Sequence, residues 1–349
     1  MKAILIQKTG SVDNIEVSDL PQPGKLKSGE VRLKFLAGSL NHLDLWVLKG
    51  LPRVTYQFPH ILGADLCAEV LESKSKKFKR GQRVVLYPAK SQGKELNGKP
   101  APENLCSDFH IRGENTSGVF AEETIAHKKF IFLAPKHLSN AEAAAMPLVY
   151  LTAWQMVYEK AGLRPKQKFD GKILVHGAGS GVSQAILNLL LSFGLKKQIA
   201  ITSRDLNKLS FWQKKGIQTF QFGSQTSDEI KNWAAGKTNE KVSIIFDHLG
   251  EKFFEMNIRL LKTGGKFITC GATTGFEGKI DLRHLYFRQL QLLGSTMGSL
   301  AHFKEMISWI TKSKITPKIA AEFDFYHPKA GFALMEAAEQ DGKIVFLRP

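Results

Sequence analysis

The sequence contains little cysteine. Its 349 residues include only three, Cys67, Cys106 and Cys270, which lie far apart and never in a Cys-x-x-Cys arrangement. An odd number of widely spaced cysteines supports neither a disulfide framework nor a zinc site built from cysteines. We therefore expect a protein of a reducing compartment, and the cytoplasm is the simplest location.

Long hydrophobic runs are also missing. The longest, 185–195, is interrupted by Asn188 and Ser192 and falls well short of the roughly 18 residues that a membrane-spanning helix needs. At the N-terminus one basic residue precedes only four apolar ones, 3–6, which is too short for the core of a signal peptide. The sequence predicts a soluble protein without a membrane span.

Acidic residues are scarce relative to basic ones. Asp and Glu number 32 against 49 Lys and Arg, which gives a net charge of +17. Such a surface attracts anions, including phosphates, nucleic acids and anionic lipids. The charge is spread along the chain, and no module that reads a nucleic-acid groove is recognisable. The basic run 74–80 is interpreted as a solvated loop, and nucleic-acid binding stays a secondary alternative.

The amount of hydrophobic sequence is ordinary for a folded protein. Hydrophobic residues make up 43% and charged residues 23%, values that argue against disorder or a collagen-like chain. At about 100–200 residues per domain, the length predicts two domains.

The first third of the chain has the pattern of short strands. Residues 2–7 and 31–37 are apolar or alternate between apolar and polar, and the breaker Pro-Gln-Pro-Gly at 21–24 separates them. Gly81 opens a turn that leads into a further apolar run. Residues 1 to about 135 are therefore predicted to form an all-β lobe.

The pattern changes near residue 140. Ser139 followed by Glu142 is typical of a capped helix start. Single apolar strands then alternate with helical patterns, which is typical of a parallel sheet with right-handed crossovers. The predicted strands are 171–176, 198–202, 241–246 and 266–270, and the predicted helix between the first two is 183–193.

A glycine-rich turn links the first of these strands to the apolar helix. Small residues at such a junction let the backbone approach a phosphate, and the free N–H groups at the helix start supply partial positive charge. A tight turn without a ligand is the alternative. The residues predicted to contact a dinucleotide here are Gly177, Ala178, Gly179, Ser180, Gly181 and Val182.

The end of the next strand favours one cofactor over another. An NAD site usually has a carboxylate there for the ribose 2′-hydroxyl, and this sequence has Thr202 instead. Asp205 comes two or three positions late and is interpreted as a helix cap. Ser203, Arg204 and Lys208 are suited to a 2′-phosphate, so NADPH is predicted rather than NADH.

At this point the sequence resembles the medium-chain dehydrogenase/reductase superfamily over essentially its whole length. The segments that carry the resemblance are the glycine-rich turn, 40–46, 58–65, 81–85, 147–154, 247–250, 270–275 and 293–298.

The resemblance implies an α/β architecture of two domains. A GroES-like, β-rich catalytic domain would comprise 1–145 completed by 315–349, and a Rossmann domain with a doubly wound parallel sheet would comprise 146–314. It also implies a homodimer joined through the Rossmann domains near 292–299, and places Asp247 and His248 near the adenosine side of the cleft. The backbone near the nicotinamide would come from Gly271, Ala272, Gly294 and Ser295.

The sequence departs from the family at the catalytic zinc. Zinc alcohol dehydrogenases use a Cys, a His and a second Cys, where this chain has Asn41, Ala64 and about Leu148. None of these is a usual zinc ligand, so no metal is predicted. An unusual site built from other side chains stays open as an alternative, with His42, Asp44, His60 and Asp65 as its candidate ligands.

Two further departures concern the structural zinc and the glycine-rich turn. The segment 88–120, where the family has four cysteines, has only Cys106, and it contains Lys90, Lys94 and Lys99 instead. Ser183 replaces the family's last glycine, so helix and strand are expected to pack slightly apart. The resemblance is therefore to the zinc-free, quinone oxidoreductase-like branch.

The chemistry implied is hydride transfer from NADPH to a quinone or an activated alkene or carbonyl. A hydrogen bond to the acceptor's carbonyl could replace zinc, and Asn41 is the first candidate for it. Tyr150 and Thr152 are second candidates, with core packing as the alternative for Tyr150 and a turn-fixing role for Asn41. The alternative functions are a zinc-type alcohol dehydrogenase with unusual ligands, a nucleic-acid-binding reductase homologue, and a homologue that binds NADPH without turnover.

Overall fold

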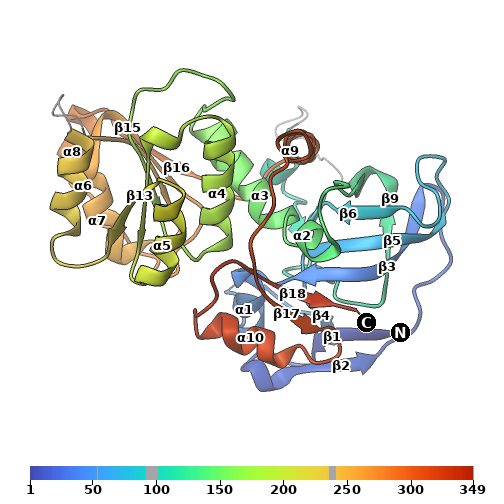
Figure 1. The fold of residues 1–349 in the computed structure, drawn as a ribbon. Helices are drawn as coiled ribbons and strands as arrows, with labels where there is room; N and C mark the ends of the chain where they lie inside the picture. Colours follow the sequence, from blue (N-terminus) through green and yellow to red (C-terminus); the bar gives the residue numbers. More distant parts are fainter. Residues whose placement is uncertain (53, 92–100, 236–240, 349) are drawn as a thin grey trace. The chain divides into compact units, whose positions relative to one another are not determined.

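The computed structural model describes residues 1–52, 54–91, 101–235 and 241–348. The chain divides into two compact units, which are drawn in Figure 1 and described separately here. Met1–Leu151 and Gly298–Pro349 form the β-rich unit, and Thr152–Met297 forms the parallel-sheet unit. The boundaries inferred from sequence, after residues 145 and 314, differ from these, because the helix α9 (Leu300–Ser313) belongs to the β-rich unit.

The β-rich unit is built on a seven-stranded sheet. Its order is β10-β6-β5-β3-β18-β17, and β9 also pairs with β3. A second sheet has the order β2-β1-β4, and β7 pairs with β8. The strands are β1 (Lys2–Ile6), β2 (Ile15–Asp19), β3 (Glu30–Ser39), β4 (His60–Ile61), β5 (Asp65–Ser73), β6 (Arg83–Leu86), β7 (Ala89–Lys90), β8 (His110–Ile111), β9 (Glu123–His127), β10 (Ile131–Leu133), β17 (Ile319–Asp324) and β18 (Lys343–Leu347).

Strand β3 lies in the middle of this sheet, and its apolar side chains alternate along its length. Val31, Leu33, Phe35 and Ala37 are buried, and the residues between them are half-buried, as the two-residue period of a strand requires. β3 pairs antiparallel with β5 on one side and with the C-terminal strand β18 on the other. The last residues of the chain therefore complete a sheet that begins near its start.

Helices of this unit lie at the ends of strands. The sequence predicted only strands in the first third, and the helix at 42–49 was missed. Ser139 caps the next helix as predicted, since its Oγ accepts from the Glu142 N–H at 3.1 Å. The helices are α1 (His42–Lys49), α2 (Asn140–Ala144), α3 (Pro147–Trp154), α9 and α10 (Lys329–Glu336), and α3 continues into a π-helical stretch, Gln155–Lys160.

The parallel-sheet unit has the predicted doubly wound architecture. Its six strands run parallel in the order β13-β12-β11-β14-β15-β16. The strands are β11 (Ile173–His176), β12 (Ile199–Ser203), β13 (Gln218–Gln221), β14 (Val242–Asp247), β15 (Leu261–Thr269) and β16 (Gln291–Gly294). The helices are α4 (Gly181–Ser192), α5 (Leu206–Lys214), α6 (Thr226–Ala235), α7 (Glu251–Leu260) and α8 (Leu282–Phe287).

Helices cover both faces of the parallel sheet. Figure 1 shows α4 and α5 on one face and α6 and α7 on the other. The core on the second side includes Ile230 from α6 and Ile258 from α7 against Leu174 and Ile245 of the central strands. The order of the strands reverses between β11 and β14, and in such sheets the ligand crevice lies at the carboxyl ends beside this switch point. No helix within the described residues is long and apolar enough to span a bilayer.

Candidate active site

The glycine-rich turn lies at the carboxyl end of β11, at the switch point. The N–H groups of Gly177 and Ala178 both donate to the Thr202 carbonyl at 3.0 Å, which fixes the turn to the end of β12. Gly177 has φ of +80°, and a Cβ there would lie 2.7 Å from His248 Nε2. Glycine is therefore required at this position for both conformation and space.

The turn leads directly into the start of α4. Ser180 is the residue before the helix, which begins at Gly181, two residues earlier than predicted. The first N–H groups of an α-helix have no partner within the helix and carry partial positive charge. All six turn residues predicted to contact a dinucleotide, 177–182, thus lie at one helix start suited to a pyrophosphate.

Ser183 connects this helix to the strand before it. Its buried hydroxyl donates to the His176 carbonyl at 2.5 Å and accepts from His248 Nε2 at 3.1 Å. The hydroxyl that replaces the family's glycine therefore forms hydrogen bonds to both β11 and the loop after β14. His248, whose imidazole lies against the glycine-rich turn, was not among the residues predicted to contact the cofactor.

His176 forms a buried polar link across the sheet that the sequence did not predict. Its Nδ1 lies 2.8 Å from Thr202 Oγ1 and its Nε2 lies 2.7 Å from Asn257 Oδ1. Burial lowers the pKa of His176 to about 4, so the ring is neutral at pH 7. Since the Asn257 oxygen only accepts, Nε2 carries the proton and Nδ1 accepts from the Thr202 hydroxyl. The Thr202 hydroxyl is thus turned inward, toward His176.

The end of β12 presents cations rather than a free carboxylate. Asp205 caps α5 as predicted, because its Oδ1 accepts from the Asn207 N–H at 2.8 Å. Arg204 is exposed and Lys208 half-exposed, and Ser203 is buried with its Oγ accepting from the Asp205 N–H. A cavity of about 510 Å³ opens beside this segment, lined by residues 218–226 and Glu229.

The residues predicted for the nicotinamide end also come together. Thr269 of β15 pairs with Gly294 of β16, and the Ser295 N–H donates to the Thr269 carbonyl at 2.9 Å. Gly271 and Ala272 follow directly after β15, so these backbone segments meet at the same sheet edge.

Two buried polar atoms at this edge lack partners within the described residues. They are Oδ1 of Asp247, at the end of β14, and Oγ of Ser295, just after β16. Buried polar atoms are normally hydrogen-bonded, so these two are suited to a polar ligand in the crevice. Together with the helix start, they show that this unit fits a dinucleotide.

Asn41 belongs to a buried polar network in the β-rich unit. Its Nδ2 donates to Asp65 Oδ2 at 2.9 Å and lies 3.4 Å from the Ser39 carbonyl. Its Oδ1 accepts from Lys343 Nζ at 2.6 Å. Lys343 Nζ also lies 3.3 Å from Asp65 Oδ2, which makes a buried ion pair. The network fixes which way the Asn41 amide points.

The order of the strands explains why these residues meet. β3 lies between β5 and β18, and its last residue, Ser39, pairs with both Asp65 and Val345. Asp65 is fully engaged, since it also accepts from the Ser39 hydroxyl at 2.9 Å and the Leu148 N–H at 2.8 Å. The sequence did not identify Lys343, although a lysine at the start of the apolar run 343–347 was a usable signal.

Asp44 adds a second buried carboxyl beside this network. It accepts from the N–H groups of Asn41 at 2.8 Å and Gly63 at 3.1 Å, which fixes the start of α1. Burial raises the pKa of Asp44 to about 7, against the opposing effect of these N–H groups and of the Lys343 charge. Burial also lowers the pKa of Lys343, against the opposing charge of Asp65.

The second candidates, Tyr150 and Thr152, lie on α3 and are both buried. The division into units falls between them, with Tyr150 in the β-rich unit and Thr152 in the parallel-sheet unit. Tyr150 is only 2% exposed, which fits the packing role left open for it.

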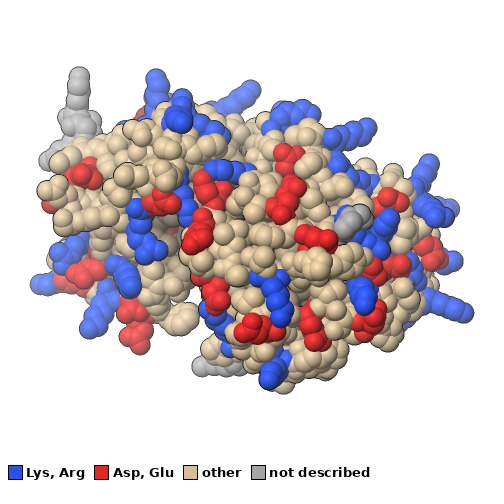
Figure 2. Space-filling model, turned by 60° about the horizontal axis from the view of Figure 1, so that its bottom comes forward, with Lys and Arg blue, Asp and Glu red and all other residues tan. Residues whose placement is uncertain are grey.

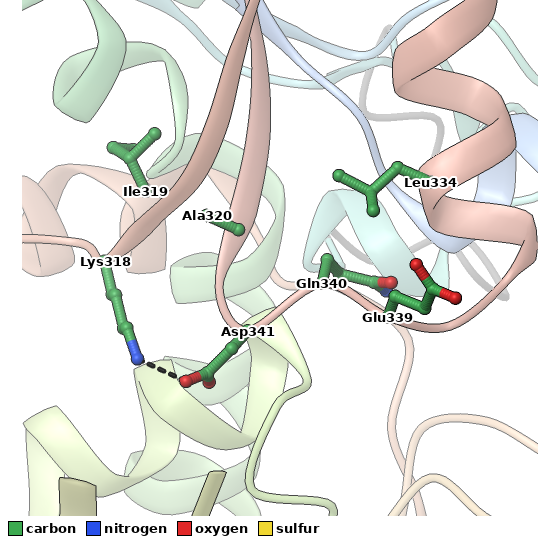
Figure 3. Close-up of a pocket in the computed structure, with 7 residues that line it drawn as sticks. All are labelled: Lys318, Ile319, Ala320, Leu334, Glu339, Gln340 and Asp341. Carbon is green, nitrogen blue, oxygen red and sulfur yellow. Dashed lines mark hydrogen bonds and ion pairs between the residues drawn. The ribbon is translucent and has the colours of Figure 1, made fainter. Parts of the chain in front are cut away.

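A cavity elsewhere in the β-rich unit involves none of these residues. It has a volume of about 360 Å³ and lies beside β17 and the loop after α10 (Figure 3). An ion pair joins Lys318 and Asp341 at its edge. The lining residues are Lys318, Ile319, Ala320, Leu334, Glu339, Gln340 and Asp341.

Comparison with known proteins identifies the family. Residues 27–136 match the alcohol dehydrogenase GroES-like domain, and residues 181–312 match the zinc-binding dehydrogenase domain. A crystal structure of an NAD-dependent alcohol dehydrogenase is 33% identical with a TM-score of 0.89, over 99% of both chains. The chain belongs to the medium-chain dehydrogenase/reductase superfamily. It is therefore an oxidoreductase of that type, and the predicted GroES-like and Rossmann folds are confirmed.

Relatives within the superfamily include reductases. Crotonyl-CoA carboxylase/reductase of Cereibacter sphaeroides is 25% identical, over 92% of this chain and 80% of the relative. The 2-methylene-furan-3-one reductase of Solanum lycopersicum is also 25% identical, over 99% of this chain and 78% of the relative. Members of the superfamily bind a nicotinamide cofactor, which the crevice of the parallel-sheet unit fits.

The residues that the resemblance matches to the catalytic zinc ligands of other superfamily members are not usual zinc ligands. They are Asn41, the buried Ala64 and about Leu148. The alternative ligand set is not brought together either. In the ranges described, no three His, Cys, Asp or Glu side chains are placed to hold a metal. His60 Nε2 instead contacts the Gly113 carbonyl at 3.0 Å. Lys94 and Lys99 lie outside the described residues.

Basic side chains do not form one band on the visible surface. On the face shown in Figure 2, Lys and Arg are interspersed with Asp and Glu. Nucleic-acid binding needs a continuous basic track along the phosphate backbone. The net charge alone therefore does not favour a nucleic-acid partner over a small anionic one.

Proposed function

We propose that this protein is an NADPH-dependent reductase that transfers a hydride to a quinone or to an activated alkene or carbonyl, without a catalytic zinc. The observation that carries the proposal is the network of Asn41, Asp65 and Lys343, in which Asn41 takes the position that the resemblance assigns to the first zinc ligand. An electron-poor acceptor needs only a hydrogen bond to its carbonyl, whereas an alcohol needs its alkoxide stabilised.

The preference for NADPH rests on the end of β12. The Asp205 carboxylate is engaged as the cap of α5, whereas the guanidinium of Arg204 is exposed beside the buried Ser203. A guanidinium forms bidentate, charge-assisted hydrogen bonds to a phosphate, and a ribose hydroxyl does not require one. The 2′-phosphate would therefore be held by Ser203, Arg204 and Lys208.

At the other end of the reaction Asn41 supplies a donor. Its 3.4 Å contact to the Ser39 carbonyl is long for a hydrogen bond, so one amide N–H is only weakly engaged. Lys343 holds the amide with its nitrogen away from the lysine, because an ammonium only donates. The dihydronicotinamide supplies the hydride, and the Asn41 N–H would stabilise the charge that develops on the acceptor oxygen. Tyr150 and Thr152 stay second candidates for this contact.

Two relatives support an alkene acceptor. The substrates in the names crotonyl-CoA reductase and 2-methylene-furan-3-one reductase both contain a C=C bond conjugated to a carbonyl. A different relative, the NAD-dependent alcohol dehydrogenase, favours a second candidate function, oxidation of an alcohol with NAD. The two candidates differ in cofactor, in acceptor and in metal content.

A cofactor titration followed by an acceptor panel tests the proposal. The fluorescence of NADPH and NADH is followed as each is added to the protein, and oxidation of the preferred one is then assayed with quinones, enones and aldehydes. We expect tighter binding of NADPH and turnover with quinones or enones. Tighter NADH binding, alcohol oxidation and stoichiometric zinc by atomic emission would together establish the second candidate instead.

We also infer a homodimer joined through β16. This strand is the last in the sheet, and α8 beside it exposes Tyr286 and Phe287, the latter 73% exposed. An unpaired strand edge next to exposed apolar side chains is a template for pairing with another chain. A two-fold axis beside β16 would pair this strand with β16 of the second copy. It would also cover the exposed apolar side chains of α8 in both copies.

A further inference from the structure

Two cations lie over one aromatic ring in the β-rich unit, and a third lies near one of them; none belongs to the sites described above. The Arg112 guanidinium carbon lies 5.8 Å from the centre of the Phe130 ring, and Lys129 Nζ lies 4.7 Å from it. Lys90 is the last residue of β7, which pairs with β8 just before Arg112. The fold therefore brings three positive charges from separate segments to one place.

Arg112 is the unusual member of this cluster because it is buried and, in the described part of the chain, has no acidic partner. It is 3% exposed, and its Nε donates to the Tyr87 carbonyl at 3.2 Å. Within the described residues no carboxylate lies within ion-pair distance of it. Burial lowers the pKa of Arg112 to about 10, with no acidic neighbour opposing the effect. Buried arginines are almost always paired, because an unpaired charge is costly to remove from water.

Lys90 adds to this excess of positive charge. Its Nζ has one long contact, 3.5 Å, to Thr116 Oγ1. Burial and the nearby Arg112 charge lower the pKa of Lys90 to about 8, which shows that the two cations repel each other. Lys90 and Thr116 are half-buried, so part of each side chain is in contact with solvent.

Two acids close in sequence are engaged elsewhere. Asp108 Oδ1 accepts from the Ser91 hydroxyl at 2.7 Å, and Glu103 Oε2 accepts from the Leu300 N–H at 2.9 Å. Lys129 is bound through its Nζ to the Ser91 carbonyl at 3.0 Å. The described chain thus stabilises the cations with carbonyls and a ring face, and supplies Arg112 and Lys90 with no negative charge.

We propose that Arg112 and Lys90 form a binding site for a phosphate-type oxyanion. With Nε bonded to Tyr87, the two terminal nitrogens of the guanidinium can bind two phosphate oxygens, and the Lys90 ammonium and Thr116 hydroxyl can bind a third. Two cations match the charge of a phosphate dianion better than that of a carboxylate. The face of Phe130 holds the guanidinium in place. The site does not depend on the proposed cofactor or acceptor.

The phosphate could be free or could be the ester group of a larger molecule. Titration calorimetry with inorganic phosphate and, separately, with methyl phosphate distinguishes these sources. Binding of inorganic phosphate alone indicates a free-anion site, and binding of methyl phosphate at least as tightly indicates a site for an ester. Each supports the proposal, and binding of neither at constant ionic strength overturns it.

Variants test whether the two cations form the site. Lys90→Gln is expected to weaken phosphate binding about 3- to 10-fold and Arg112→Gln at least 10-fold, as expected for lost charge-assisted hydrogen bonds. Arg80→Gln removes one exposed positive charge from the loop 74–80 and is the matched control, with unchanged binding expected. Equal loss in all three variants would show only non-specific attraction to a basic protein.

A second measurement covers the case in which Arg112→Gln does not fold. Phosphate should raise the melting temperature of the intact protein, and the increase should be smaller in Lys90→Gln than in Arg80→Gln. Glu95, outside the described residues, is the rival source of negative charge. The proposal is wrong if three results are found together. Glu95→Gln destabilises the protein, its effect is strongly coupled to that of Lys90→Gln in a double-mutant cycle, and phosphate has no effect on any variant. The cluster would then be neutralised by the chain's own carboxylate.

Discussion

Lys343 Nζ lies 2.6 Å from Oδ1 of Asn41, although 302 residues separate them in the chain. The contact fixes the orientation of the Asn41 amide, with its oxygen on the lysine and its nitrogen on Asp65 at 2.9 Å. Amide oxygen and nitrogen are otherwise close in shape, and a neutral neighbour would allow either orientation. The lysine thereby makes Asn41 a donor toward the rest of its surroundings.

Replacing Asn41 with Ala tests the proposed donor. We expect kcat/KM for the preferred quinone or enone to fall about 100-fold, by analogy with the loss of one oxyanion donor. The dissociation constant of NADPH should not change, because Asn41 belongs to the β-rich unit. Ser39→Ala is the control: it removes another hydrogen bond to Asp65 and should cost about 1 kcal/mol of stability with little effect on kcat. Unchanged kcat/KM in Asn41→Ala would remove Asn41 from the mechanism.

The buried ion pair is tested by removing each partner. Lys343→Met leaves the Asp65 charge buried and unpaired, so we expect the free energy of unfolding to fall by about 3–5 kcal/mol. The double variant Lys343→Met with Asp65→Asn should lose less than the sum of the two single variants, as measured by urea unfolding. Strictly additive losses would mean that the two side chains do not interact.

The lowered pKa of the buried His176 imidazole predicts that the stability of the protein depends on pH. The unfolded chain takes up a proton on this imidazole near pH 6.5, whereas the folded protein does so only near pH 4. Acidification between these values therefore favours unfolding, and this group should lower the free energy of unfolding by up to about 3 kcal/mol. Urea midpoints at several pH values measure the effect.

The matched variants for this dependence are His176→Gln and His284→Gln. Glutamine does not titrate, so His176→Gln should show a flatter profile between pH 6.5 and 4. His284 is exposed on α8 in the same unit, and its replacement should leave the profile unchanged. An equally steep profile in His176→Gln would show that other groups cause the acid sensitivity.

Arg204 is expected to decide between the two cofactors. Arg204→Ala should weaken NADPH binding about 10- to 100-fold, since hydrogen bonds to charged groups contribute about 1.5–3 kcal/mol, and should leave NADH binding unchanged. Lys214→Ala is the control, because it removes one positive charge from the last turn of α5, the helix that begins after Asp205. An equal loss of affinity for both cofactors in Arg204→Ala would argue against a 2′-phosphate contact.

The oligomeric state depends on the edge of the parallel sheet. Phe287→Glu combined with Leu292→Glu puts charge into the exposed apolar surface beside β16 and should convert a dimer into a monomer. Light scattering after size-exclusion chromatography measures the mass. Leu206→Glu, at a leucine on α5 that is more exposed than Leu292, should leave the dimer intact. A monomeric parent protein would contradict the inferred interface.

Short sequence patterns were sufficient to predict the architecture of the parallel-sheet unit. The strands at 173–176 and 199–203 were predicted within one or two residues because buried strands are continuous apolar runs. The glycine-rich turn was located because a strand, a turn and a helix follow one another directly in the chain. Asp205 was correctly read as a cap for the same reason, since a cap bonds to a residue only two positions away.

Contacts between distant segments left no such pattern. The strand predicted at 266–270 begins earlier, at Leu261. The helix α1 was missed because the strand patterns on either side hid the capping signal of Asn41 and Asp44. Nothing near Arg112 in the sequence indicates that Lys129 lies over the same ring or that Lys90 lies nearby. Such groupings depend on strand order, which periodicity does not encode.

The sequence by itself determined the two-domain architecture and the position of the glycine-rich turn, and it predicts the absence of the usual zinc ligands, because each of these depends on neighbouring residues or on residue identity. Only the tertiary structure decided that Lys343 and Asp65 occupy the surroundings of Asn41, and that Arg112 is buried with no carboxylate of the described residues beside it. The physical reason is that burial and pairing depend on which strands meet: β3, β5 and β18 meet near Asn41, and β7 and β8 meet beside Arg112.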